Sequence, residues 1–189
     1  MACASVSAQS VSEMFIEMPD SMLPYMPKEL RKELVGIKRL EPDSVATLSN
    51  ALGVTKITRF SDEVMMVSLA KNVTMEIGRP DSLHIVVLKT FAVPEQESVC
   101  KIYDNEWNEI GVQTFCNELL TVKPDTMTQD RYDELLSMIE FPMVSATFGE
   151  DATMLILGME VPLLNGDDKK KLEAVISSRR LKWTGKIFN

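Results

Sequence analysis

The sequence predicts an α+β protein in which amphipathic helices cover one antiparallel sheet. Between Val54 and Tyr103, apolar residues recur at every second position, which is the repeat of strands with one buried face and one wet face. Short turns rich in Asn, Asp, Pro and Ser separate five such segments, and connections this short join only antiparallel neighbours. Segments with helical periodicity lie on both sides of this meander. We therefore expect a single antiparallel sheet, built from the central meander, a later hairpin and a C-terminal strand.

Length and composition favour one globular domain. The chain has 189 residues, of which 45% are hydrophobic and 25% charged, so one well-filled core is expected. No apolar run approaches the roughly 20 residues that a membrane-spanning helix needs. The net charge of -8 repels phosphate backbones, so nucleic acid is not an expected partner.

The first residues resemble the end of a signal peptide. The stretch Ala2 to Ala8 is small and uncharged, with Val6 and Ala8 placed as signal peptidase prefers. We therefore expect residues 1–8 to be a signal-peptide remnant, residues 9–189 to form the domain, and the protein to be exported to the periplasm or cell envelope. The basic and apolar parts that precede a cleavage site are missing, so either the start codon lies upstream of Met1 or the match is accidental.

Two helices are predicted before the meander. Ser10 and Glu13 have the spacing of a capping box, which predicts a short helix from Val11 to Met18. A second helix is predicted from Pro27 to Leu40, because its apolar residues recur at spacings of three and four beneath a charged face.

After the meander, the pattern returns to helices and one hairpin. Polar connections are expected over Glu41–Gly53 and Asn105–Asp125, which show little periodicity. A helix is predicted over Thr128–Glu140, after a capping-box pair at Thr126 and Gln129. A hairpin of Met143–Phe148 and Ala152–Val161 follows it. The last predicted elements are a helix over Asp168–Arg180 and a strand over Lys182–Phe188. All three long helices are expected to pack against the sheet.

The C-terminal strand should be held in the fold by its aromatic residues. Strand alternation places Trp183 and Ile187 on the core side, and Lys182 and Lys186 on the solvent side.

Motifs at both ends of the chain resemble a known family. MPDSMLPY at Met18–Tyr25 and WTGKIF at Trp183–Phe188, together with Arg59–Glu63 and Ile102–Trp107, resemble a domain-of-unknown-function family from Bacteroidales. The similarity spans nearly the whole chain. It implies a small exported protein with no assigned activity, and it transfers no catalytic residue.

The resemblance also suggests a modification. Four tripeptides of Asp, a hydroxyl residue and an apolar residue match the O-glycosylation sequon of exported Bacteroidales proteins. Their hydroxyl residues are Ser21, Ser44, Ser82 and Thr126. The alternative is that Asp-Ser and Asp-Thr pairs recur at turns and caps for local reasons.

Two cysteines beyond the N-terminal stretch are candidates for a disulfide. In an oxidising compartment Cys100 and Cys116 could pair, whereas the alternative is two unpaired buried thiols.

The acidic stretch after the meander offers a weak calcium candidate. Asp104, Glu106 and Asn108 stand at the first, third and fifth positions of a calcium loop. Glu109 and Phe115 occupy the later positions that need glycine and glutamate, so a polar turn is the preferred interpretation.

Two further patterns are weaker still. Met14, Met18, Met22 and Met26 are spaced by four, which suits a thioether site for monovalent copper, but prolines interrupt the spacing and core packing is preferred. His84, the one histidine, lies in an apolar strand and is expected to face solvent.

No reactive constellation stands out from the sequence. It contains no nucleophile elbow, phosphate-binding loop or zinc-spaced Cys/His set, so we assign no catalytic residue, cofactor or metal. The leading hypothesis is an exported non-enzymatic binding or envelope-associated protein, with an envelope protein or glycan as its partner. The alternative is a carboxylate-dependent hydrolase. A cavity with two buried, pKa-perturbed carboxylates would favour the hydrolase, and an exposed apolar patch with a polar rim would favour the binding protein.

Overall fold

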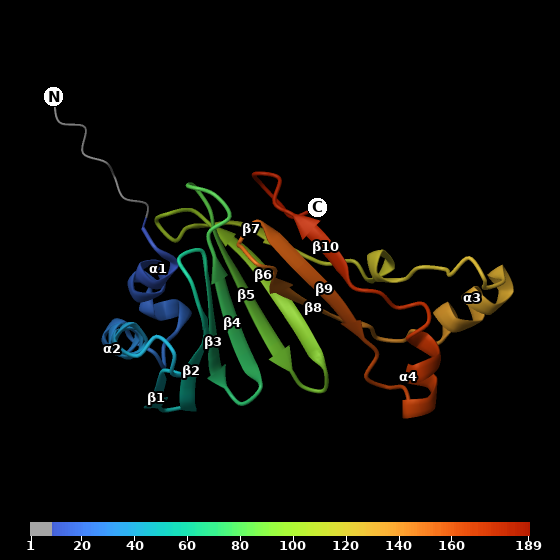
Figure 1. The fold of residues 1–189 in the computed structure, drawn as a ribbon, viewed down its shortest axis with the longest axis horizontal. Coiled ribbons are helices and arrows are strands. Elements are labelled where there is room, and N and C mark those ends of the chain that lie inside the picture. Colours follow the sequence, from blue (N-terminus) through green and yellow to red (C-terminus); the bar gives the residue numbers. More distant parts are fainter. Residues whose placement is uncertain (1–8) are drawn as a thin grey trace.

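The computed structural model of the chain describes residues 9–189 (Figure 1). The predicted signal-peptide remnant, residues 1–8, lies outside the described residues. The described chain forms an α+β fold with two antiparallel sheets, which confirms the predicted class. In this described part, no helix is long and apolar enough to cross a membrane.

The first sheet is a meander of seven strands that follow one another in sequence order. All neighbours are antiparallel, and the predicted segments form its five middle strands. The strands are β1 (Thr47–Asn50), β2 (Gly53–Phe60), β3 (Val64–Ala70), β4 (Val73–Gly78), β5 (Ile85–Ala92), β6 (Gln96–Tyr103) and β7 (Glu109–Gln113). Strands β1 and β7 fall in stretches expected to be polar connections. In β7 the alternation of Ile110 and Val112 is the signal that identifies the strand.

The hairpin and the C-terminal strand form a second sheet, which packs on the first instead of extending it. Its order is β10-β9-β8, made of β8 (Met143–Phe148), β9 (Met154–Glu160) and β10 (Arg179–Lys182). The expectation of one solvent-exposed face is therefore wrong for the part of the meander that both layers cover. Four consecutive residues of β5, Ile85 to Leu88, are buried there, because this half of the strand has a cover on each side.

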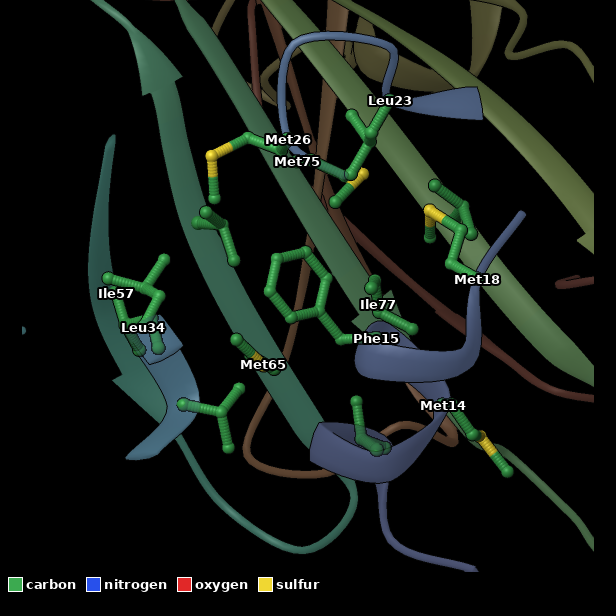
Figure 2. Close-up of a cluster of buried hydrophobic side chains, with 14 of the residues drawn as sticks. Met14, Phe15, Met18, Leu23, Met26, Leu34, Ile57, Met65, Met75 and Ile77 are labelled. Carbon is green, nitrogen blue, oxygen red and sulfur yellow. The ribbon is translucent and has the colours of Figure 1, made fainter. Parts of the chain in front are cut away.

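Helices cover the other face of the meander at its β1–β4 end (Figure 1). They are α1 (Val11–Glu17), the short 3₁₀ helix η1 (Asp20–Met22) and α2 (Lys28–Leu40). The predicted capping box is present, since Ser10 and Glu13 bond each other's backbone N–H groups. Figure 2 shows Phe15 of α1 projecting into the middle of this core, among side chains from α2 and the strands.

One buried charge fastens these helices together. Arg31 of α2 is 1% exposed, and its guanidinium donates to the backbone carbonyls of Ile16, Met18 and Met26. It also pairs with Asp20 at 3.0 Å. The planar fork of arginine satisfies several acceptors at once, so one side chain fixes the α1–η1 connection onto α2.

The two later helices do not cover a face of the meander, although Lys169 of the second helix pairs with Glu95 in the β5–β6 turn at 2.7 Å (Figure 1). These are α3 (Gln129–Ser137), capped by Thr128, and α4 (Gly166–Leu172). They share a small separate cluster whose buried residues are Leu135, Val161, Leu172 and Val175. The expectation that they pack on the sheet, and that Thr126 caps the first of them, is therefore wrong.

The last helix is also shorter than predicted, ending at Leu172 and not Arg180. Beyond it the chain pairs with the segment that follows the short 3₁₀ helix η2 (Asn117–Leu120). Val122 N–H donates to Val175 at 2.8 Å, and Ser177 N–H donates to the Leu120 carbonyl at 2.9 Å. These non-local bonds use backbone groups that a longer helix would need.

The C-terminus is held in the fold by its aromatic residues, as expected, but Phe188 takes the buried place that was predicted for Ile187. Phe188 is 2% exposed, whereas Ile187 is 47% exposed. Trp183 pairs with Phe188 in an antiparallel bridge, and Gly185 between them has a φ of +89°. The chain therefore turns back on itself, and the alternation of a straight strand does not apply.

Candidate functional site

Part of the first sheet carries exposed apolar residues on its helix side. Phe91, Val99 and Val112 are 44%, 41% and 54% exposed, and come from β5, β6 and β7. In the strand register Lys89 is opposite Val99, and Lys101 is opposite Val112, so these side chains share one face. We call this surface the open face. Its members are Lys89, Phe91, Val99, Lys101 and Val112, and the buried Val87 and Tyr103 continue the same side of β5 and β6 into the helix-side core.

A cavity of about 290 Å³ lies between η1 and the open face. Its lining consists of Ser21, Met22, Val87, Lys89, Phe91, Val99, Lys101 and Tyr103. Lys89 Nζ donates to the Met22 carbonyl at 3.2 Å, which ties η1 to β5. We call this the η1 cavity.

The two lysines of the η1 cavity have different environments. Burial, followed by the nearby charge of Lys101, lowers the pKa of Lys89. Lys101 donates to Glu109 at 2.6 Å, and this hydrogen bond raises the pKa of Lys101. Burial raises the pKa of the neighbouring Tyr103 hydroxyl. The cavity thus combines two cations and a phenol with apolar walls.

A second cavity of about 410 Å³ adjoins the first, because Val99 lines both. It lies where the start of β6 and the end of β7 meet the start of β8, and we call it the edge cavity. Its lining is Glu97, Ser98, Val99, Val112, Gln113, Thr114, Phe115, Asn117, Pro142 and Val144. The η1 cavity and the edge cavity thus lie side by side around exposed valines. Adjoining apolar cavities of this kind can receive side chains of a partner.

The one buried carboxylate among the described residues lies elsewhere. Glu76 of β4 is 3% exposed, and burial raises its pKa. Its Oε2 accepts from Phe148 N–H and from the Thr147 hydroxyl, both at 3.1 Å, so Glu76 joins the two sheets. It lines neither cavity. The pair of perturbed carboxylates that would favour a hydrolase is not found in either hollow.

The histidine belongs to a hydrogen-bonded cluster and does not simply face solvent. His84 Nδ1 lies 2.8 Å from Asp81 Oδ1, and Trp183 Nε1 donates to Asp81 Oδ2 at 2.7 Å. The rings of His84 and Trp183 meet edge to face at 5.2 Å. Burial alone would raise the pKa of Asp81, but donors from Leu83 N–H, Trp183 and His84 outweigh it and lower that pKa. This cluster ties the β4–β5 turn to the C-terminus.

The calcium candidates form a turn stabilised by its own hydrogen bonds. Asp104 accepts from the N–H groups of Glu106 and Asn108 and from the Asn108 amide, each at 2.9 Å. Within the described residues, no group of three or more His, Cys, Asp or Glu side chains is arranged to hold a metal ion.

The sulfur-containing candidates are separated in space. Cys100 is buried between the sheets and Cys116 is exposed, and both are free thiols in this structure. Burial raises the pKa of the Cys100 thiol to about 12. Of the four spaced methionines, Met14, Met18 and Met26 lie in the helix-side core, while Met22 lines the η1 cavity.

All four predicted glycosylation residues are exposed. Ser21 lies in η1 and lines the η1 cavity, and Ser82 lies in the β4–β5 turn. Ser44 and Thr126 lie in connections outside the strands and helices.

These features define an α+β protein with two packed antiparallel sheets and an exposed apolar face with two cavities. The chain belongs to the family described as protein of unknown function (DUF3256), whose profile matches residues 3–188. It is also similar to the structure of a domain of an uncharacterized protein from Porphyromonas gingivalis W83, with a TM-score of 0.75 and 18% sequence identity over 97% of this chain and 98% of that chain. At this identity the likeness shows a shared fold. No curated protein matches the chain.

Proposed function

We propose that this chain is an exported, non-enzymatic binding protein that receives an apolar segment of an envelope protein on its open face. The observation that carries the proposal is the set of exposed Phe91, Val99 and Val112 beside two adjoining cavities. Exposed apolar side chains grouped on one sheet face lower the free energy of the complex when a partner removes them from water. The lysines and Glu109 at the rim provide polar contacts that orient the partner.

Site-specific photo-crosslinking in the native host tests this function. A benzophenone amino acid replaces Val99 on the open face, and a matched variant carries it at Val122, which is 57% exposed and lies outside that face. We expect one discrete protein adduct from position 99 and none from position 122. The proposal is wrong if position 99 yields no discrete adduct, or if both positions yield the same products.

Export and glycosylation are separate parts of the proposal. They are supported by the signal-peptide-like N-terminus and by the exposure of the four sequon residues. We expect protein purified from the native host's envelope fraction to begin at Gln9 and to carry mass increments on peptides that contain Ser21, Ser44, Ser82 or Thr126. Intact-mass and peptide mass spectrometry measure both. An unmodified mass would show that the glycosylation proposal is wrong, and a cytoplasmic protein that begins at Met1 would show that the export proposal is wrong.

A further inference from the structure

We propose that the η1 cavity binds a carboxylate carried on a short apolar stem. This inference rests on the proposed function and specifies the chemical group that the open face recognises. The cavity provides one polar end and one apolar end, and each has a clear match in such a ligand.

The polar end contains donors that the fold leaves available. An ammonium group has three donors, and Lys89 Nζ uses one of them on the Met22 carbonyl. Tyr103 lines the same cavity, and its hydroxyl makes no hydrogen bond to any described residue. A carboxylate accepts up to about four hydrogen bonds, so it can bond both groups at once.

Charge complementarity points to the same ligand. The chain carries a net charge of -8, yet the charged residues that line this cavity are Lys89 and Lys101. Glu109 pairs with Lys101 from β7 and does not line the cavity. A bound carboxylate would therefore relieve the repulsion between two neighbouring cations, whereas a cationic ligand would increase it.

The remaining walls set the size of the stem. Met22, Val87, Phe91 and Val99 are apolar, and a volume of about 290 Å³ is at the lower limit for small-molecule sites. A stem of a few carbon atoms fits this space. Two sources share this chemistry: a free short-chain carboxylic acid, and the C-terminal residue of an apolar partner chain.

An NMR titration of the full chain with small probes tests the inference. The probes are hexanoate, hexanamide and acetate, which separate the charge from the stem. We expect hexanoate to shift backbone signals of β5 and β6 saturably. Hexanamide and acetate should each bind at least about tenfold more weakly than hexanoate, because each lacks one of the two interactions.

Substitutions assign the binding to the lysines. Lys89→Met keeps the aliphatic stem and should weaken hexanoate binding about tenfold, while Lys89→Arg keeps the charge and should retain most of it. Lys101→Met should have a smaller effect, because Lys101 is already paired with Glu109. Lys56→Met, an exposed lysine on β2, is the matched control. Unchanged thermal unfolding of each variant excludes a folding defect.

Three results would overturn the proposal: no saturable shift with hexanoate, equal affinity for hexanoate and hexanamide, or unchanged affinity in Lys89→Met. An acetylated tripeptide ending in leucine distinguishes the sources. Binding of its free acid but not its amide identifies a chain terminus, and binding of hexanoate alone identifies a free acid. A failed titration with a discrete crosslink at position 99 would remove this inference and leave the binding function in place.

Discussion

Asp81 connects two parts of the chain that are about a hundred residues apart in sequence, since its carboxylate accepts from Trp183 and from the N–H groups of Leu83 and His84. Asp81→Asn replaces one acceptor oxygen by an amide donor, so at least one of these donors loses its partner. We expect a loss of about 1–3 kcal/mol in the free energy of unfolding at neutral pH. Urea unfolding measures it.

The pH dependence provides an independent check on Asp81. Because its pKa is lowered in the folded state, its contribution is present above the ordinary aspartate pKa and is lost as the pH falls through the folded value. The difference between wild type and Asp81→Asn should therefore shrink below about pH 4. Asp43→Asn, at an exposed position, is the control and should change little. A difference that does not vary with pH would contradict this role.

Glu76 should show the opposite pH dependence. Its pKa is raised, so its contribution is fully present below the ordinary glutamate pKa and is lost as the pH rises through the folded value. Glu76→Gln stays uncharged and keeps an acceptor for Thr147 and Phe148. We expect its stability relative to wild type to increase between about pH 4 and pH 7, measured by urea unfolding at each pH. Glu33→Gln on the exposed side of α2 is the control, and parallel profiles for wild type and Glu76→Gln would disprove the assignment.

At the scale of elements, the two sheets pack closely where Gly78 of β4 meets Phe148 of β8. A Cβ at Gly78 would lie 2.4 Å from Phe148 Cζ, which is closer than packed atoms allow. Gly78→Ala should therefore cost about 1–3 kcal/mol by forcing the ring or the strand to move. Thermal and urea unfolding measure this cost.

Two further variants test the cause. Gly36→Ala in α2 places its Cβ in open space and should stabilise the protein by about 0.5–1 kcal/mol through helix propensity. The cost of Gly78→Ala should be smaller in a Phe148→Leu background than in wild type, because the smaller side chain leaves room for the new Cβ. If Gly78→Ala unfolds like wild type, the sheets do not pack this closely.

At the scale of the whole molecule, the C-terminal segment closes one end of the contact between the sheets. Phe188 packs in the core. Its backbone N–H donates to the Gln113 side chain of β7 at 2.8 Å, and the Gln113 amide donates to the Phe188 carbonyl at 2.7 Å. Deleting residues 183–189 removes this aromatic packing and leaves Asp81 without its Trp183 donor. We expect a loss of about 3 kcal/mol or more, seen as a lower melting temperature. Ile187→Ser at an exposed position should change little, and a truncated chain that melts like wild type would show that the segment does not contribute to folding.

The sequence by itself determined the local parts of this fold. The five middle strands of the meander, the β8–β9 hairpin and the capping box of α1 depend on residue alternation, turn residues and a spacing of three. These signals act between residues close in the chain, so they survive in any tertiary context. The alternation also places Lys89 and Phe91 on one face of β5.

Only the tertiary structure decided how the layers assemble. It placed β8–β10 over the meander as a second sheet, buried Glu76 between the sheets, and ended α4 at Leu172. It also left the open face exposed next to η1, which no periodicity predicts. Periodicity states that a side chain lies on a given face of a strand, whereas the cover over that face is chosen by contacts between residues far apart in sequence.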